Sequence, residues 1–425
     1  MEKRIISICF IIILVIFNTS CSYNKHNDEV EDKYANTKHD NDQIIIDDKD
    51  DEEIKDKPIV IIDPINQQLS EMTLEQKIGQ MLIVGVEGYT IGENSKSLIK
   101  DNKIGGFIIY GDNVESSSQL LKLTNDLKEI NSTNNIPLFI SVDEEGGRVS
   151  RMPSEFNNIP SYSYIGSIND KEYAYNIGSV IAEEIKQFGF NLNFAPVLDI
   201  NSNPQNQVIG DRSLGSNEII VSELGIQIMK GLSENKVVPV VKHFPGHGDT
   251  YIDSHIGLPI VNKTIDELNS FELIPFKDAI ANGADMIMIA HILMKEIDSE
   301  NPASLSNVII TDVLRNQLKF EGVVITDDIT MGAVTTNYTT EEAVVKAVQA
   351  GNDIVLVAHG YDNALLAIQT LKQKVENNIV PEARIDDSVY RILKLKYKYN
   401  LEDNISKQVG VEKINKLINQ IKKGH

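Results

Sequence analysis

The sequence predicts a (β/α)₈ barrel that forms a single catalytic domain. Three observations support this fold class: eight short apolar runs alternate with longer amphipathic segments, the alternation extends over residues 67–400, and ionisable residues stand at the ends of most runs. Alternating strands and helices are typical of parallel βαβ units, and eight such units close a TIM barrel in roughly 250 residues or more. A doubly wound open sheet is the alternative that the same alternation allows.

The eight apolar runs are rich in branched and aromatic residues, as expected for strands buried on both faces. Each run is short enough for a strand, and the segments between the runs are long enough for helices. In chain order the runs are MLIVGV (81–86), GGFIIYG (105–111), PLFISVD (137–143), FNLNFAPVLD (190–199), VPVVKHF (238–244), ADMIMIAH (284–291), GVVITDD (322–328) and NDIVLVAH (352–359).

Helices are predicted between these runs. Thr264 with Glu267, and Thr339 with Glu342, have the spacing of capping boxes, in which a hydroxyl and a carboxylate accept backbone N–H groups at a helix start. The helical segments include 115–131, 169–188, 217–235, 264–282, 307–319 and 339–350.

Ionisable residues close six of the eight runs. The C-terminal ends of all strands in a barrel meet at one mouth, where the active sites of such barrels lie. We therefore expect an enzyme, or at least a protein that binds a polar ligand. The residues at these ends are Asp143, Asp199, Lys242, His243, His291, Asp327, Asp328 and His359.

The N-terminus has the pattern of an export signal. Lys3 and Arg4 precede an apolar run from Ile5 to Phe17, which is too short to span a membrane. The run leads to Cys21, which favours a lipoprotein signal whose lipidated cysteine becomes the new N-terminus; a simple cleaved signal is the alternative. We expect an extracytoplasmic bacterial protein that is held on the cell membrane by a lipid at Cys21.

Negative charge is concentrated after this signal. Residues 28–57 hold 13 Asp and Glu against 5 Lys, a net −8 within the −22 of the whole chain. The stretch lacks apolar periodicity, which predicts a disordered linker at 22–66, after the signal peptide at 1–21. After the barrel we predict a C-terminal tail at 401–425. The acidic balance argues against nucleic acid as a partner, because phosphate binding needs a surplus of Lys and Arg.

Residues 242–255, KHFPGHGDTYIDSH, carry three of the eight histidines. His243 and His247 have the spacing of two metal ligands on one helix face, but the Pro and Gly residues there predict a tight loop, and we expect no metal site. Asp253 and His255 are two residues apart, so the carboxylate can orient the imidazole for proton transfer near neutral pH. A hydrogen bond that only stabilises the loop is the alternative.

The stretch GVVITDDITMGA (322–333) places two carboxylates at the end of a buried strand. Unpaired carboxylates are costly there unless they have partners or a function. Asp327 or Asp328 could be a nucleophile, while its neighbour orients other groups; capping of the next helix is the alternative.

The stretch VDEEGGRVSR (142–151) follows the third run and turns at a Gly-Gly pair. Asp143, Arg148 and Arg151 could converge there on a hydroxyl-rich ligand. Asp–Arg pairs of this kind are also common as structural ion pairs.

Five motifs in order along the chain closely resemble glycoside hydrolase family 3, and within it the β-N-acetylglucosaminidase (β-hexosaminidase) branch. The resemblance extends over about residues 67–400, and KHFPGHGDT with the following DSH is its most specific part. The motifs are VDEEGGRVSR, GDRSLG (210–215), KHFPGHGDTYIDSH, VVITDDITMGA and AGNDIVLV (350–357).

This resemblance implies a retaining double displacement. Asp327 matches the nucleophile of the family, and His255 matches the general acid/base of this branch, with Asp253 as its partner. His247 and Asp249 match positions that shape the loop. Five further positions match residues that hold the hydroxyls and acetamide of N-acetylglucosamine (GlcNAc): Asp143, Arg151, Arg212, Lys242 and His243.

The resemblance implies a carbohydrate partner and no metal or organic cofactor. We expect a monomer that removes terminal β-linked GlcNAc from peptidoglycan fragments or related glycans. One alternative is a β-N-acetylglucosaminide phosphorylase, because a neutral histidine base would tolerate an incoming phosphate; another is a different β-glycosidase of the family. A non-catalytic glycan-binding lipoprotein is the third, disfavoured by the presence of Asp253, His255 and Asp327.

Overall fold

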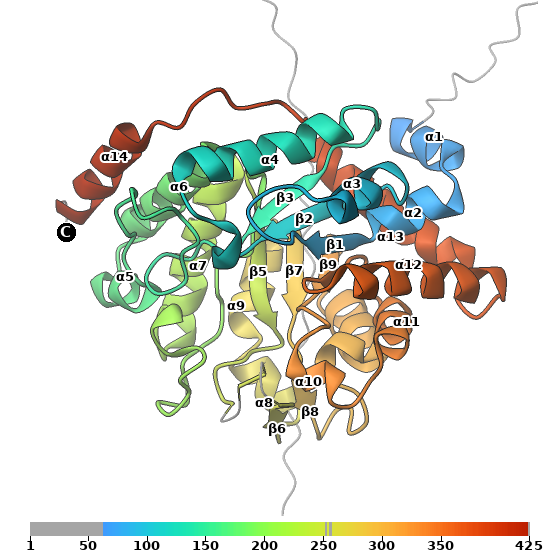
Figure 1. Cartoon of the computed structure of the whole chain (residues 1–425). Coiled ribbons are helices and arrows are strands. Elements are labelled where there is room, and N and C mark those ends of the chain that lie inside the picture. Colours follow the sequence, from blue (N-terminus) through green and yellow to red (C-terminus); the bar gives the residue numbers. More distant parts are fainter. Residues whose placement is uncertain (1–62, 251–252, 255–256, 424–425) are drawn as a thin grey trace, which may run out of the picture. The chain divides into compact units, whose positions relative to one another are not determined.

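A computed structural model describes residues 63–250, 253–254 and 257–423. Eight parallel strands pair in the order β10-β1-β2-β3-β4-β5-β7-β9, with helices packed around them (Figure 1). An isolated parallel bridge between Ile325 and Ile354 joins the two end strands and closes the sheet. The (β/α)₈ barrel is therefore confirmed, and the doubly wound sheet is excluded.

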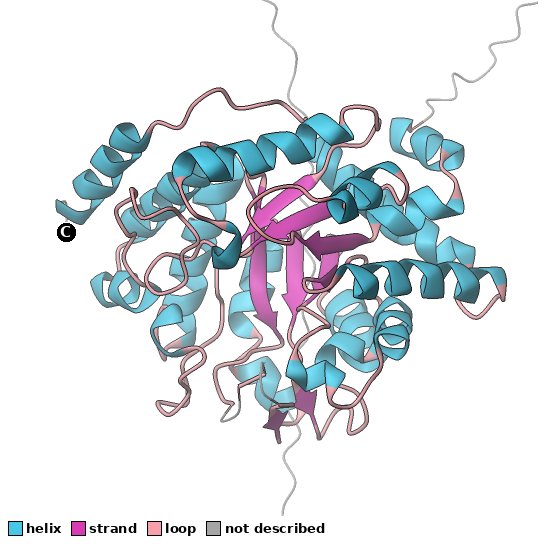
Figure 2. Ribbon diagram, in the orientation of Figure 1, coloured by secondary structure: helices cyan, strands magenta, loops and turns pink. Residues whose placement is uncertain are grey.

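Each of the eight predicted runs contains one barrel strand, which Figure 2 shows at the centre of the helices. A separate two-stranded sheet, β6 (Ile260–Val261) with β8 (Leu293–Met294), lies among the loops beyond the C-terminal end of β7. The barrel strands are β1 (Leu82–Gly85), β2 (Gly106–Ile109), β3 (Phe139–Val142), β4 (Leu192–Asn193), β5 (Val238–Phe244), β7 (Met286–Ile289), β9 (Val323–Thr326) and β10 (Val355–Val357).

The helices begin where the capping residues predict. Both Thr264 and Thr339 make complete capping boxes. The helices and helical turns are α1 (Pro64–Glu71), α2 (Leu74–Gln80), α3 (Glu93–Lys100), η1 (Gly111–Asn113), α4 (Ser117–Asn131), α5 (Tyr162–Ile168), α6 (Lys171–Lys186), η2 (Gly210–Arg212), α7 (Glu218–Glu234), α8 (Ile265–Ser270), α9 (Ile274–Ala281), η3 (Ala303–Leu305), η4 (Val308–Gln317), α10 (Gly332–Thr335), α11 (Thr340–Ala350), α12 (Tyr361–Glu376), α13 (Glu382–Lys398) and α14 (Val411–Lys423).

One predicted helix, 264–282, is interrupted. It forms α8 and α9 because Pro275, in the first turn of α9, has no N–H to donate to the carbonyl of Phe271, and its ring would clash with that carbonyl in a continuous helix. Within the described ranges, no helix combines the length and the apolar character needed to cross a membrane.

The folded domain extends past both predicted boundaries. Asp63 caps α1 by accepting the N–H of Ile65, so the fold includes residues 64–66, which we had predicted as linker. α14 falls within the predicted tail, but it is amphipathic and buries Ile414 and Ile418, packing beside α6. The signal peptide, Cys21 and nearly all of the linker lie outside the described residues.

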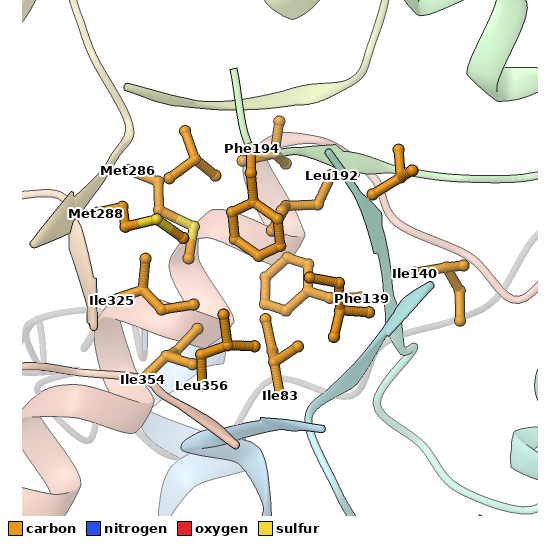
Figure 3. Packing of buried hydrophobic residues seen from close by; sticks show 14 of the residues in the cluster. Ile83, Phe139, Ile140, Leu192, Phe194, Met286, Met288, Ile325, Ile354 and Leu356 are labelled. Atoms are coloured by element: carbon orange, nitrogen blue, oxygen red, sulfur yellow. The ribbon is translucent and has the colours of Figure 1, made fainter. Parts of the chain in front are cut away.

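The interior of the barrel is filled by apolar side chains rather than open. Figure 3 shows buried apolar side chains from β1, β3, β4, β7, β9 and β10, most of which pack against one another inside the barrel. They leave the C-terminal mouth as the place where polar side chains collect. The labelled residues of this core are Ile83, Phe139, Ile140, Leu192, Phe194, Met286, Met288, Ile325, Ile354 and Leu356.

The seam between β9 and β10 combines backbone hydrogen bonds, such as the one from the N–H of Thr326 to the carbonyl of Ile354, with side-chain acceptors. Asp353 Oδ2 accepts the N–H of Val324 (2.9 Å), and Thr326 Oγ1 accepts the N–H of Leu356 (3.0 Å). Asp328 Oδ1 likewise accepts the N–H of Ala358 (2.9 Å). Carboxylates and a hydroxyl thus take the place of some backbone carbonyls at this joint.

Candidate active site

A cavity of about 600 Å³ opens at the C-terminal ends of the barrel strands. It brings together seven of the eight residues assigned from the sequence to catalysis or sugar binding: Asp143, Arg151, Arg212, Lys242, His243, Asp253 and Asp327. The eighth, His255, lies outside the described residues. These residues lie at the ends of β3, β4, β5 and β9 or in the loops that follow them, so several strand ends contribute to one cavity, as the sequence predicted.

Lys242 lies between two carboxylates at the base of this cavity. Its Nζ atom is 2.5 Å from Asp143 Oδ1 and 2.8 Å from Glu145 Oε1. Glu145 also accepts two hydrogen bonds from Arg212, each 2.8 Å long. Two cations thus face two carboxylates.

The pKa values of this network are set by competition between burial and charge. Burial alone would raise the pKa of Glu145, but Arg212 and Lys242 outweigh burial and hold this pKa well below its usual range. Burial would lower the pKa of Lys242, yet Asp143 and Glu145 raise it. Lys242 and Glu145 are therefore both charged at neutral pH.

His243 is oriented by a fully buried carboxylate. Its Nδ1 lies 2.6 Å from Asp199 Oδ2, and its Nε2 lies 3.5 Å from Arg212 Nη2. Asp199 Oδ1 also accepts the N–H of His247 at 2.6 Å. Burial would raise the pKa of Asp199, but its electrostatic interaction with His243 and these hydrogen bonds lower it. Asp199 therefore holds the His243 ring with Nε2 toward the cavity wall.

The two adjacent carboxylates at the end of β9 have different environments. The Asp328 carboxylate is held in position by three hydrogen bonds. It accepts them from the N–H groups of Thr330 (3.0 Å) and Ala358 (2.9 Å) and from the Thr330 hydroxyl (2.6 Å). Asp327 is half-buried in the cavity wall, and its Oδ1 accepts the N–H of Asp328 at 2.8 Å.

The surroundings of Asp327 favour the ionised form of its carboxylate. Burial would raise its pKa, but electrostatic interactions with His291 and His243, together with the N–H of Asp328, lower the pKa below its ordinary value. Of the two, Asp327 therefore has the environment of a nucleophile and Asp328 that of a structural residue.

The loop after β5 carries the remaining candidates. Asp253 and Ser254 line the cavity, but the geometry of the Asp253–His255 pair stays a prediction because His255 is not described. His247, expected only to shape the loop, bonds Thr250 Oγ1 (2.8 Å) and Ser254 Oγ (3.3 Å), and its ring also lines the cavity. Asp249 pairs with Lys263 at 2.8 Å, which fits a role in shaping the loop.

The two arginines of the loop after β3 differ in their partners. Arg148 is exposed, pairs with Asp211 at 2.6 Å and donates to carbonyls of residues 207–209, so it braces the neighbouring loop. The buried Nε of Arg151 has no hydrogen-bond partner among the described residues, which leaves a donor for a ligand. Arg151 thus has the free donor capacity that a sugar-binding residue needs.

Glu144, Glu145 and Tyr110 were not assigned from the sequence. Glu144 accepts the N–H groups of Gly146 and Arg151 and so holds the loop after β3, while burial raises its pKa. Tyr110 stacks on His359 at the cavity rim, with ring centroids 5.2 Å apart. A signal was available for Glu145: it stands two residues after Asp143 in an acidic pair that follows a buried strand.

The geometry does not favour a metal site at the histidines. Both ring nitrogens of His247 lie near hydroxyls, and Nδ1 of His243 is bound to Asp199. Across the residues that the structure describes, no group of three or more His, Cys, Asp or Glu side chains is arranged to hold a metal ion.

Comparisons with known proteins agree with this geometry. A model described as the N-terminal domain of glycosyl hydrolase family 3 matches residues 73–395. β-Hexosaminidase A of Pseudoalteromonas piscicida is 34% identical over 368 residues, 77% of this chain and 61% of that protein. β-Hexosaminidase of Nitrosomonas eutropha is 34% identical over 311 residues, 72% of this chain and 87% of that protein. The chain thus spans about three fifths of the first relative and most of the second.

A solved structure is similar over most of the fold. It is a glycoside hydrolase family 3 β-N-acetylglucosaminidase from Paenibacillus sp. str. FPU-7, with a TM-score of 0.79 and 38% sequence identity. The similarity covers 82% of this chain and 68% of that one.

Proposed function

This chain belongs to glycoside hydrolase family 3, and on that premise we propose that it is a retaining exo-β-N-acetylglucosaminidase acting on terminal β-linked GlcNAc. The observation that carries the proposal is Asp327, a carboxylate with a lowered pKa in the wall of a polar cavity. Peptidoglycan fragments or related glycans of the cell envelope are the proposed substrates.

In the proposed first step, an Asp327 oxygen attacks the anomeric carbon while the bond from that carbon to the leaving-group oxygen breaks. His255, oriented by Asp253, gives its proton to that oxygen. In the second step His255 takes a proton from water, whose oxygen displaces Asp327 and releases GlcNAc with the original β configuration.

The wall around Asp327 suits an uncharged, hydroxyl-rich sugar. Lys242 and Arg212 are balanced by the carboxylates of Asp143 and Glu145, so the wall offers both donors and acceptors without a surplus of charge. Arg151 adds the unpartnered donor described above. Charge-assisted hydrogen bonds of this kind hold hydroxyl and acetamide groups in a fixed orientation.

We also propose that the protein is exported, lipidated at Cys21 and active as a monomer. The basic residues, short apolar run and cysteine at the N-terminus support the first two proposals. The third is supported by the cavity, in which one chain already brings together seven of the eight assigned site residues. Mass spectrometry of the N-terminal peptide from membranes tests the lipid, and replacing Cys21 by Ser should release the protein from them.

The activity is tested by incubating the purified protein with aryl β-GlcNAc, aryl β-glucoside and aryl β-xyloside, in buffers with and without phosphate. We expect rapid release of the aryl group from β-GlcNAc alone, with free GlcNAc as the sugar product in both buffers. GlcNAc-1-phosphate as the main product in phosphate would establish a phosphorylase. No release from any substrate would support a non-catalytic glycan-binding protein.

A further inference from the structure

A second cavity, of about 370 Å³, lies at the end of the barrel opposite the candidate active site. It is bounded by the turn that precedes β7, the turn that precedes β9 and one face of α13. Four of its lining side chains are cationic and two are acidic: Lys319, Arg391, Lys394, Lys398, Asp285 and Glu321.

The cations of this cavity are only partly neutralised. Lys398 is bound by both oxygens of Asp285, at 2.6 and 2.8 Å. Lys319 and Lys394 are exposed, and neither forms a salt bridge within the part of the chain that the structure describes. Two ammonium groups therefore remain available to a ligand, with Glu321 as the acidic neighbour.

A surplus of positive charge also lies directly behind the cavity. The buried carboxylate of Asp353 is shared by Arg315 (2.6 Å), Arg391 (3.0 Å) and Arg384 (3.8 Å), so that three guanidinium groups face one carboxylate. Arg391 is the member of this cluster that lines the cavity. The surplus charge of the cluster therefore reaches the cavity wall through Arg391.

Repulsion among the three guanidinium groups contributes to the lowered pKa values of Arg315 and Arg384. Burial lowers the pKa of Arg315, and the like charge of Arg391 acts in the same direction against the attraction of Asp353. Arg384 is affected in the same way. An anion bound at Arg391 would relieve this repulsion.

The walls of the cavity are held in place before any ligand binds. Arg315 Nη1 donates to the carbonyls of Phe320 (3.0 Å) and Gly322 (2.6 Å), which fixes the turn that carries Lys319. At Gly322 an added Cβ would lie 2.4 Å from the carbonyl oxygen of Asp285, so this turn packs closely against the turn before β7. A preformed wall lowers the entropic cost of binding.

We propose that this cavity binds a phosphoryl group, carried by a small soluble ligand or by a lipid headgroup. The unpaired Lys319 and Lys394, together with Arg391 from the positively charged cluster, lie around a concave, preformed surface. Lys and Arg groups in such a setting bind phosphate oxygens through charge-assisted hydrogen bonds. The net charge of −22 disfavours a long polyanion, so a ligand with one phosphate fits this site better than a nucleic acid. The site is separate from the proposed hydrolase activity and needs no catalytic residue.

The test measures binding of two probes to the full chain at constant ionic strength by isothermal titration calorimetry. Inorganic phosphate represents the soluble source, and glycerophosphoglycerol represents a deacylated lipid headgroup. We expect saturable binding of inorganic phosphate, and a Kd about tenfold higher in Lys394→Glu and in Lys319→Glu, because each reversal replaces an attraction with a repulsion. If glycerophosphoglycerol also binds, with the same dependence on Lys394, the natural ligand is a lipid headgroup. If only inorganic phosphate binds, the natural ligand is a small soluble phosphate.

Lys236→Glu is the matched control. Lys236 is exposed, precedes β5 in an equivalent turn and has a φ of 65°, close to the 59° of Lys319, but it does not line the cavity. The control should leave the Kd unchanged. The proposal is overturned if the unmodified chain binds neither probe saturably, or if Lys236→Glu weakens binding as much as Lys319→Glu. Melting temperatures without phosphate check the fold, and Lys394→Glu, on an exposed helix face, carries the test if Lys319→Glu does not fold.

Discussion

The carboxylate of Glu145 accepts both Nε and Nη2 of Arg212 at 2.8 Å. The same carboxylate is 2.8 Å from Lys242 Nζ, so replacing Glu145 by Gln would leave two buried cations with Asp143 alone. We expect Glu145→Gln to lower the free energy of unfolding by about 3 kcal/mol. Its kcat/KM on aryl β-GlcNAc should fall at least about 100-fold, because both sugar-binding cations lose their position.

Asp211→Asn is the control for this variant. Asp211 pairs with Arg148 at 2.6 Å, but both side chains are nearly half exposed. Removing an exposed pair should change the free energy of unfolding by less than about 1 kcal/mol. Urea unfolding of both variants makes the comparison, and equal losses would contradict the assignment of Glu145.

The two carboxylates at the end of β9 should respond oppositely to substitution. Asp327→Asn removes the proposed nucleophile and should lower kcat at least about 10⁴-fold, with little change in unfolding. Asp328→Asn should instead lower the free energy of unfolding by about 2 kcal/mol, because Asp328 accepts hydrogen bonds from Thr330 and Ala358. Steady-state kinetics and urea unfolding of the pair test this, and normal turnover in Asp327→Asn would refute the mechanism.

His255→Ala tests proton donation to the leaving group. An activated aryl group leaves without a proton, whereas a sugar alcohol needs one, so the variant should lose activity on a GlcNAc disaccharide more than on a nitrophenyl glycoside. The ratio of the two kcat/KM losses is the measurement, with an expected value above about 10. Equal losses on both substrates would point to a structural role for His255.

The pH dependence of stability should contain a contribution from His247. Burial, reinforced by the electrostatic interaction with His243, lowers the pKa of His247 from 6.5 to about 4. As pH falls from 6.5 to 4, the unfolded chain binds a proton that the folded chain does not, so stability is lost over this window. The loss amounts to about 3 kcal/mol at most.

His247→Gln removes this contribution while keeping a side chain that can bond Thr250. Urea unfolding at pH 7 and at pH 4.5 should show the original chain losing about 2 kcal/mol more than the variant. Parallel losses in the two proteins would show that His247 takes up its proton equally in the folded and unfolded chain.

Much of the fold followed from local patterns because buried parallel strands are continuous apolar runs. The runs around β7 and β10 have this form, and the capping box at Thr339 marked the start of α11. The interruption at Pro275 was missed because the apolar periodicity continues through it. α14 was missed because its apolar face is short and becomes buried only by packing against α6.

The sequence predicted those site residues that stand at the ends of strands. Asp143, Lys242 and Asp327 follow apolar runs, and the barrel then brings strand ends together whatever their separation in sequence. The roles of Glu145 and Asp199 could not be read in this way. They depend on contacts with Arg212 and His243, 67 and 44 residues away, and sequence spacing alone does not determine such contacts.

Because some hydrogen-bond acceptors at the β9–β10 seam are side chains, we expect the barrel wall to open first at this seam when the pH falls. Backbone carbonyls do not titrate, but the Asp353 carboxylate does; burial would raise its pKa, and the three neighbouring guanidinium groups lower it. Acid strong enough to protonate Asp353 should therefore loosen this joint before it loosens the β2–β3 pair, which has four residue pairs in register. The amide hydrogen of Val324, which Asp353 accepts, should then exchange earlier than those of β3. Since Asp327 directly follows β9, acidification would displace the nucleophile while most of the barrel is still intact, and activity would disappear ahead of structure.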